Sequence, residues 1–171
     1  MRITQSLGSI SRLAGGLFFS VRHLSKQLVA EGVEVAVLSL ADRHSEEDRP
    51  AWQPEQPRVL KPGWPRSLRF AAGFRQALEQ SRPDILHTQG IWQYPSLVAL
   101  GWKRRGGGAH VASPRGMLEP WAWRHQAWKK RPLWWAWERR NLSSAAVLHA
   151  TSTQEAQQFR ALGFTQPIAI I

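Results

Sequence analysis

The residues best suited to bind an anionic ligand lie directly after a predicted strand or directly before a predicted helix. Arg115 lies in residues 113–117 (SPRGM), after a short apolar run, and a guanidinium can donate two parallel hydrogen bonds to a phosphate or a carboxylate. Gly116 beside it gives the backbone room. Gly15 and Gly16 precede a helical pattern, where backbone N–H groups and the helix dipole favour a phosphate. These positions predict an anion-binding site. The structural alternatives are a surface ion pair for Arg115 and a tight glycine turn that binds no ligand.

A third polar group follows another apolar run, and two common classes of site are excluded. His87, Gln89 and Gly90 could contact a ligand at a strand end, although an isolated histidine there is more often structural. The glycine spacing matches neither G-x-G-x-x-G nor G-x-x-x-x-G-K-[ST], which argues against a dinucleotide oxidoreductase and a P-loop NTPase. The chain has no cysteine and its other histidines are scattered, so no metal site is predicted.

Composition indicates one globular domain with an anionic partner. The 171 residues fit a single core, and 43% of them are hydrophobic. The formal charge of +11 attracts phosphates, nucleic acid or an anionic membrane surface. No apolar run approaches the roughly 20 residues that cross a bilayer, and the N-terminus lacks the pattern of a signal peptide. We therefore expect a cytoplasmic protein.

Alternating strand and helix patterns must position these residues. Strands are expected at residues 3–7, 33–40, 58–60, 85–87, 110–113, 145–149 and 167–171. Helices are expected at 17–29, 66–80, 94–105, 118–142 and 153–162, with a loop at 41–57. Pro132 should break or kink the longest helix.

This order predicts an α/β fold, a Rossmann-like doubly wound and mainly parallel sheet of six or seven strands. Ligands bind at the carboxyl ends of such strands, so the polar loops should lie along one edge of the sheet. They are residues 8–16, 87–92, 113–117 and 151–155. The chain ends within a strand pattern at 168–171, which we interpret as a cut at a domain boundary.

The order of these segments resembles the N-terminal domain of group 1 (family 4) glycosyltransferases, which have the GT-B fold. The resemblance covers nearly all of residues 1–171, and the most specific segments are 113–117 (SPRGM) and 149–155 (HATSTQE). It is also carried by Gly15-Gly16 and by residues 84–92 (DILHTQGIW). The resemblance implies a cleft between two Rossmann-like domains, an acceptor held mainly by this one, and a glycine loop that approaches the donor phosphate.

The resemblance also implies a C-terminal domain that holds most of the nucleotide-sugar and carries a Glu-x7-Glu pair. That domain is absent from residues 1–171, so we expect this chain to be inactive alone. Sugar transfer with retention of configuration is implied as well. The expected substrate-binding residues are Gly15, Gly16, His87, Gln89, Gly90, Arg115, Gly116, Met117, Ser152 and Glu155.

No catalytic residue is assigned in this half, and neither a metal nor a cofactor is expected, because the nucleotide-sugar is a substrate. Many members of the family carry histidines at the positions of Arg115 and Gln89, although a subset carries Arg-Gly-Met. The predicted function is transfer of a hexosyl-type sugar from a nucleotide-sugar to a glycan or lipid-linked acceptor in cell-surface polysaccharide synthesis. The expected partners are these substrates and the C-terminal domain of the same enzyme.

A belt of tryptophan and basic residues adds a second prediction. Residues 115–140 hold seven Lys or Arg, two Glu and six Trp, and Trp121, Trp128 and Trp135 are spaced by seven. We expect about half of the six in the core and the rest exposed, as in a helix that lies on anionic lipid at the inner membrane face. A single-stranded nucleic-acid-binding module would share this composition. It would not explain the glycine loop or the Arg-Gly-Met segment; a non-catalytic interaction module is the third alternative.

Overall fold

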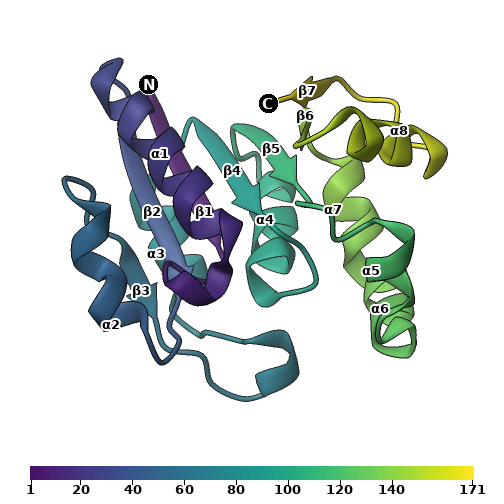
Figure 1. The fold of residues 1–171 in the computed structure, drawn as a ribbon, viewed down its shortest axis with the longest axis horizontal. Helices are drawn as coiled ribbons and strands as arrows, with labels where there is room; N and C mark the ends of the chain where they lie inside the picture. Colours follow the sequence, from purple (N-terminus) through teal and green to yellow (C-terminus); the bar gives the residue numbers. More distant parts are fainter.

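The computed structural model describes the backbone of residues 1–171 and every side chain except that of Arg66. Its centre is a seven-stranded sheet in which every neighbouring pair of strands is parallel, in the order β3-β2-β1-β4-β5-β6-β7. The strands are β1 (Arg2–Leu7), β2 (Glu34–Leu40), β3 (Arg58–Leu60), β4 (Ile85–Gln89), β5 (Ala109–Ser113), β6 (Val147–Ala150) and β7 (Ile168–Ile170). The predicted Rossmann-like α/β fold is confirmed (Figure 1).

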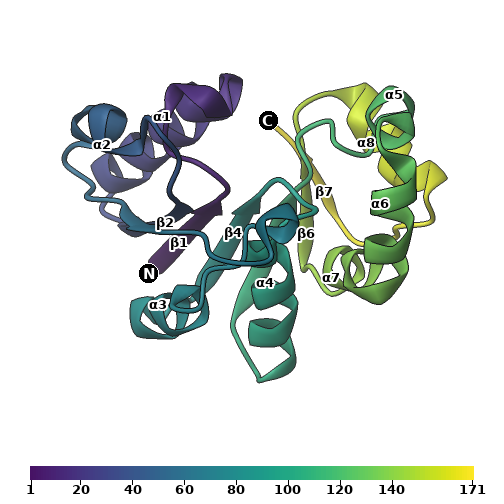
Figure 2. The same cartoon turned by 90° about the horizontal axis from the view of Figure 1, so that it is seen from below.

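Helices cover both faces of the sheet. The α-helices are α1 (Gly16–Ala30), α2 (Ser45–Asp48), α3 (Phe74–Ser81), α4 (Tyr94–Arg104), α5 (Pro120–Arg124), α6 (Ala127–Leu133), α7 (Arg139–Ser143) and α8 (Thr153–Ala161). Three 3-10 turns, η1 (Arg12–Ala14), η2 (Arg49–Trp52) and η3 (Arg66–Leu68), and a π-helical turn, η4 (Trp134–Glu138), complete the elements. Figure 2 shows α1 and α2 above one part of the sheet and α3 and α4 below it.

Strand alternation builds the core on both faces. In β2, Val37 packs with α1 residues such as Phe18 and Val21, whereas its neighbour Leu38 packs with Phe74 of α3 on the opposite face. A third cluster joins Leu148 of β6 to the helices that follow β5 and β6. Apolar residues on both faces are expected for central parallel strands, because helices cover them from both sides.

The order of the strands changes direction at β1. From β1 the chain passes through α1 to β2, whereas from β4 it passes through α4 to β5 on the other side of β1. The connections therefore diverge between β1 and β4, which lie side by side with Leu7 opposite Gln89. Ligand crevices in open parallel sheets form at this kind of divergence.

The segment at 41–57, expected as a loop, contains α2 and η2. Asp42 starts the first turn, because its carboxylate accepts hydrogen bonds from the backbone N–H of His44 (3.0 Å) and from the Ser45 hydroxyl (3.1 Å). Trp52 then anchors η2 in the core by donating from its indole N–H to the carbonyl oxygen of Ile10 at 2.8 Å. Polar composition alone did not reveal these side-chain anchors.

The helix expected at 66–80 was also wrong in its first half, since α3 begins only at Phe74. Arg69 adopts a left-handed backbone conformation with φ of 52°. Its guanidinium donates to the carbonyl oxygens of Gly8 (2.7 Å) and Ala41 (3.0 Å), so this part of the chain is held against the loops after β1 and β2.

Pro132 does not break the helical stretch that follows β5. The chain turns earlier, at Gln126, which has a left-handed backbone with φ of 54°. Pro132 lies inside α6, and the helical path continues through η4 and α7 to Ser143. A proline removes one backbone donor from a helix, and the π turn directly after it keeps the chain helical.

Among the described residues, no helix combines the length and the apolar character that crossing a membrane requires.

Candidate functional site

The four polar loops lie along one edge of the sheet, as the sequence predicted. Leu7, Gln89 and Ser113 stand in register at the carboxyl ends of β1, β4 and β5. Gly16 and Arg115 line the same open hollow of about 470 Å³. The glycine loop after β1 and the arginine loop after β5 therefore face each other across this edge.

The glycine loop is shaped by backbone conformation. Gly15 has φ of 57° and ψ of −128°, in a region that side chains rarely adopt, and it is the residue before α1. Gly16 is the first residue of α1, and a Cβ built there would meet no atom within 4 Å. The first N–H groups of a helix have no partner within it, so this end of α1 presents donors and positive partial charge to the hollow.

Arg115 is held in place by a chain of amides. Its Nε donates to Gln89 Oε1 at 2.8 Å, and Gln89 Nε2 donates to Gln5 Oε1 at 3.0 Å. Burial lowers the pKa of Arg115 and the neighbouring Glu155 raises it, but a guanidinium keeps its charge in either case. The side chain is thus a fixed cation, positioned through its Nε, at the edge of the hollow. Gln89 acts here as a positioning residue.

Gly116, Ser152 and Glu155 form a second, internal network. Glu155 is buried, and its carboxylate accepts from the Gly116 N–H at 2.7 Å and from both the N–H and the hydroxyl of Thr151 at 2.8 Å. The Ser152 hydroxyl accepts from the Glu155 N–H at 3.1 Å and caps α8. Both side chains, expected to bind substrate, have polar atoms engaged in joining the turn after β6 to the arginine loop.

His87 pairs with His149, which was not among the predicted site residues. His87 Nε2 and His149 Nδ1 lie 3.1 Å apart, and both rings are buried. Burial, followed by the charges of His149, Arg115 and His110, lowers the pKa of His87 to about 3. Burial and Arg115 likewise lower the pKa of His149. Both rings are therefore neutral at pH 7, and the pair shares a single hydrogen bond.

Met117, together with Ala14 and Leu17, lies between the open hollow and a second cavity. The Met117 sulfur accepts from the Ile91 N–H at 3.3 Å, and its side chain lines both spaces. Gly90 has φ of 86°, and a Cβ there would lie 3.0 Å from the Met117 methyl group. Gly90 thus meets two demands, a left-handed turn and close contact with Met117.

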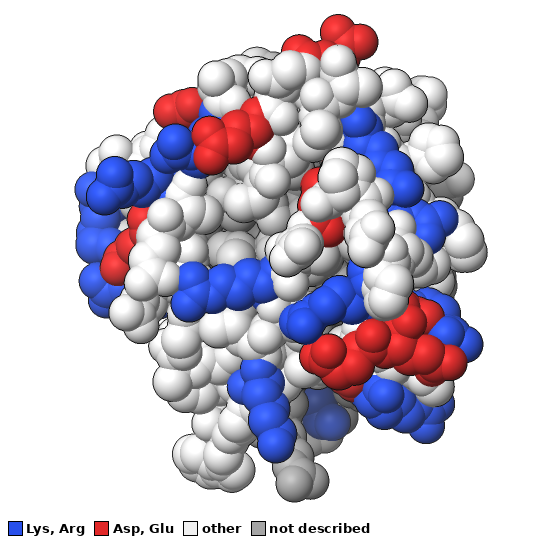
Figure 3. All heavy atoms as spheres, turned by 90° about the vertical axis from the view of Figure 1, so that its left-hand side faces the viewer, with Lys and Arg blue, Asp and Glu red and all other residues white. Residues whose placement is uncertain are grey.

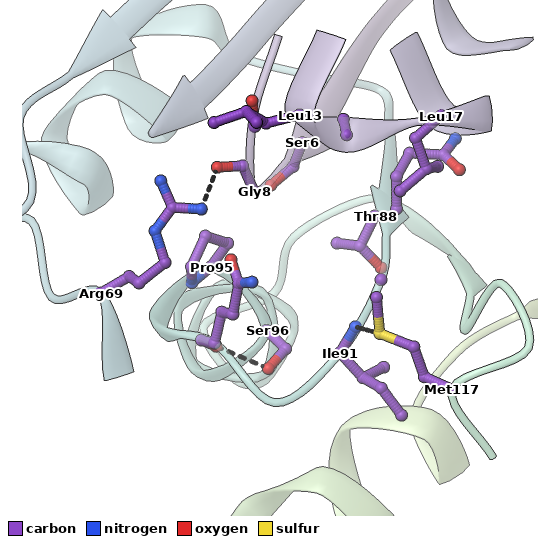
Figure 4. A pocket seen from close by; sticks show the side chains of 15 residues that line it. Ser6, Gly8, Leu13, Leu17, Arg69, Thr88, Ile91, Pro95, Ser96 and Met117 are labelled. Atoms are coloured by element: carbon purple, nitrogen blue, oxygen red, sulfur yellow. Dashed lines mark hydrogen bonds between the residues drawn. The ribbon is translucent and has the colours of Figure 1, made fainter. Parts of the chain in front are cut away.

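The second cavity occupies the divergence between β1 and β4, with a volume of about 240 Å³ (Figure 4). Leu13, Leu17, Ile91 and Met117 form its apolar walls. Its polar lining comes from Ser6, Gly8, Ser9, Arg69, Thr88, Gln89, Gln93 and Ser96. No residue of this lining is acidic.

Two polar atoms of this cavity have no protein partner among the described residues. They are the hydroxyl of Ser6, a residue only 2% exposed, and the amide oxygen of Gln93. A buried polar group without a partner costs free energy, which a hydroxyl-bearing ligand or water would offset. Neither residue was predicted from sequence, because Ser6 lies inside a strand and Gln93 lies beyond the loop ends. Only the divergence at β1 could have indicated them.

Buried Glu138 fixes the loop that forms one wall of the cavity. Its carboxylate accepts from the Trp92 N–H at 2.9 Å, from the Ser96 hydroxyl at 2.8 Å and from the Asn141 amide at 3.1 Å. Burial raises the pKa of Glu138, and these hydrogen bonds act in the opposite direction. The π turn of η4 thereby holds Trp92, which has a left-handed backbone with φ of 71°.

Comparison with known proteins identifies the family of this arrangement. The model of the glycosyl transferase 4-like domain matches residues 15–171. The chain belongs to this family. The match begins at Gly15 and includes the arginine loop, the histidine pair and the turn after β6.

Solved structures share the fold of this glycosyl transferase 4-like domain at low sequence identity. Anabaena Alr3699/HepE, crystallised in complex with UDP and glucose, is 14% identical with a TM-score of 0.72, and the match covers 100% of this chain and 44% of HepE. Acinetobacter baumannii MurG is 14% identical with a TM-score of 0.56, covering 99% of this chain and 44% of MurG. Phytolacca americana apo UGT2 is 11% identical with a TM-score of 0.61, covering 100% of this chain and 52% of UGT2.

The glycosyl transferase 4-like domain therefore spans about half the length of these structures. Its sheet is the Rossmann-like half of a GT-B fold, as the resemblance implied. No curated protein matches the chain.

Proposed function

We propose that this domain is the acceptor-side half of a glycosyltransferase that moves a hexosyl-type sugar from a nucleotide-sugar to a glycan or lipid-linked acceptor. The observation that carries the proposal is the convergence of three features at one sheet edge. These are the N-terminus of α1 at Gly16, the fixed guanidinium of Arg115, and the cavity at the β1–β4 divergence.

The open hollow has the chemistry of a phosphate-facing surface. Backbone donors of α1 and the charge of Arg115 both favour a group with negative charge, such as the diphosphate of a nucleotide-sugar. Structures with the same fold were crystallised with UDP and glucose and with UDP-2-fluoro-glucose and pterostilbene. These complexes support the assignment of a nucleotide-sugar to the cleft that this edge would face.

The smaller cavity has the chemistry of an acceptor site. Its free Ser6 hydroxyl and Gln93 oxygen suit sugar hydroxyls, and its apolar walls suit the less polar face of a sugar ring. Met117, Ala14 and Leu17 line both this cavity and the open hollow, so an acceptor and a donor phosphate would lie on either side of a thin shared wall.

The proposal includes a C-terminal domain that holds most of the donor, so residues 1–171 alone would not transfer sugar. It includes no metal or cofactor. It places the enzyme in cell-surface polysaccharide synthesis, in the cytoplasm at the inner membrane face, in peripheral contact with anionic lipid.

Two measurements test the proposal. Calorimetry of residues 1–171 against UDP-, GDP- and ADP-sugars should show no binding as tight as micromolar, and micromolar binding would show that the donor site is misplaced. In the complete enzyme, Ser6→Ala should raise KM for the acceptor and leave KM for the donor unchanged. Ser143→Ala, at an exposed position on α7, is the matched control. An equal effect of Ser6→Ala on both KM values would reject the acceptor assignment.

A further inference from the structure

Three tryptophans point into solvent from the segment between β5 and β6. Trp121 of α5 is 74% exposed, Trp128 of α6 is 73% exposed, and Trp135 of η4 is 67% exposed. Trp128 and Trp135 stand seven residues apart on the helical run that continues through α7, which is about two helical turns. Large exposed apolar groups grouped in this way mark interaction surfaces on soluble domains.

The segment that carries these three tryptophans, residues 120–143, is rich in exposed basic residues. Its exposed cations are Arg124, Lys129, Arg131, Arg139 and Arg140. Together with Trp121, Trp128 and Trp135 we call them the Trp–cation strip. The one acid between residues 120 and 143 is Glu138, which is fully buried. Two cations lie over the indoles, with Lys129 Nζ 5.0 Å from the ring centre of Trp128 and Arg139 Cζ 5.7 Å from that of Trp135.

Some basic residues elsewhere on the molecule have acidic partners. The face that carries α1, α2 and β3 shows Lys and Arg beside Asp and Glu (Figure 3), and its ion pairs include Arg12 with Asp48 and Arg49 with Glu46. None of the five strip cations takes part in an ion pair of the described side chains. Their charge is therefore available to an external anion.

The inner side of these helices fixes the orientation of the strip. Trp134, adjacent to Trp135, is buried and packs edge-on against Trp123 with ring centres 5.1 Å apart. Trp134 also contacts Trp92 and Phe164. Because Trp134 occupies the core, its neighbour Trp135 points outward, and this indole is already in place on the surface.

We propose that the Trp–cation strip is a docking surface for a bilayer that contains anionic lipids, with Trp121, Trp128 and Trp135 seated at the headgroup–acyl boundary. Indoles favour this boundary because they combine an apolar ring with one N–H donor, and Lys and Arg beside them favour anionic headgroups. Single-stranded nucleic acid would instead need a basic groove that follows its backbone. Neither the open hollow nor the acceptor cavity is lined by a residue of the strip.

This inference gives the proposed membrane contact a surface, and it rests on the proposed function only for the identity of the acceptor. Five residues of chain separate Arg115 from Trp121, at the start of α5. Docking through the strip would therefore bring the arginine loop close to the membrane, where a lipid-linked acceptor would be found.

The test measures binding of the 171-residue chain to vesicles by flotation. We expect strong binding to phosphatidylcholine vesicles with about one third phosphatidylglycerol, and weak binding to phosphatidylcholine alone. Changing Trp121, Trp128 and Trp135 together to Ala should weaken binding by about tenfold or more, because three interfacial anchors are lost. Trp64→Ala is the matched control, since Trp64 is 85% exposed in the loop after β3, outside the strip.

Each outcome decides the proposal. Circular dichroism should show unchanged folding, because the three replaced side chains are exposed. Vesicle binding that needs both phosphatidylglycerol and the three indoles supports the docking surface, whether or not the complete enzyme transfers sugar. Equal binding by the triple variant and by Trp64→Ala overturns it. Absence of vesicle binding, with tight binding to an oligothymidylate that the triple variant loses, overturns it in favour of a nucleic-acid surface.

Discussion

The carboxylate of Glu155 accepts a hydrogen bond from the backbone N–H of Gly116 at 2.7 Å, and so the first turn of α8 holds the loop that presents Arg115. The same carboxylate closes the turn after β6 through Thr151. One buried acid therefore sets the geometry of two loops at the candidate site.

Glu155→Gln should destabilise the domain. The amide nitrogen of glutamine cannot accept a hydrogen bond, so either Gly116 or Thr151 would lose its acceptor inside the protein, at a cost of about 1–3 kcal/mol. Urea unfolding measures the effect. Glu31→Gln, at an exposed position after α1, should leave the free energy of unfolding unchanged. Equal stability of Glu155→Gln and wild type would show that the carboxylate is not needed to hold the loops.

Arg115→Lys should impair sugar transfer in the complete enzyme while leaving the fold intact. Lysine cannot donate to Gln89 and to a phosphate with a planar fork, and the expected loss is about 2–3 kcal/mol of transition-state binding. The measurements are kcat/KM and the unfolding midpoint. Arg104→Lys, at the end of α4, controls for the change of residue type. Wild-type kcat/KM in Arg115→Lys would assign this arginine a structural role.

Truncation of two adjacent tryptophans should change the stability of the domain by very different amounts. Trp134→Ala removes a buried indole from the contacts with Trp92, Trp123 and Phe164 and should cost about 3–5 kcal/mol of stability. Trp135→Ala removes an exposed indole and should change stability by about 0.5 kcal/mol or less. Chemical denaturation of the two variants compares them directly, and similar losses would contradict the inward and outward orientations.

Stability should fall as the pH drops below about 6.5, the ordinary pKa of histidine. Burial lowers the pKa of His87 to about 3 and that of His110 to about 4, so the unfolded chain binds protons that the folded chain does not. The stabilisation is complete above pH 6.5 and is lost as the pH falls toward the folded values. Each ring contributes up to about 1.4 kcal/mol per pH unit in this window.

Urea unfolding between pH 7.5 and pH 5 measures this dependence. His87→Gln should reduce its slope, whereas His23→Gln, at an exposed position on α1, should not. Glu138 acts in the opposite direction, because burial raises its pKa and the folded state takes up its proton first. An unchanged slope in His87→Gln would show that this ring is not buried in the neutral form.

The strands, and the edge of the sheet that carries the candidate site, could be predicted from the sequence because their signals are local. Apolar runs such as 33–40 and 145–149 predicted β2 and β6 to within two residues at either end, and parallel topology then placed Gly16 and Arg115 at one edge. The failures depended on contacts between distant residues. Arg69 ends a helical pattern because it binds the loops after β1 and β2, which its neighbours in sequence do not reveal.

The polar residues of the candidate site also divide into those that local signals predict and those that depend on contacts between distant residues. Arg115 and the glycines could be selected by residue type, but the pairing of His87 with His149 joins residues 62 positions apart. Likewise, the acidic anchors Glu138 and Glu155 act through backbone N–H groups of other loops, and nothing in their own segments specifies those partners. Ser152 was predicted as a ligand contact, and its hydroxyl accepts a hydrogen bond from the Glu155 N–H and caps α8.

The thioether of Met117 belongs, with Ala14 and Leu17, to the wall shared by the second cavity and the open hollow. Methionine has three rotatable bonds and a soft sulfur, so it changes shape at little cost. A ligand in either space would contact side chains that also line the other space. In the proposed enzyme, binding of one substrate would then change the shape of the site for the other before any bond is made or broken, through the wall that Met117 forms with Ala14 and Leu17.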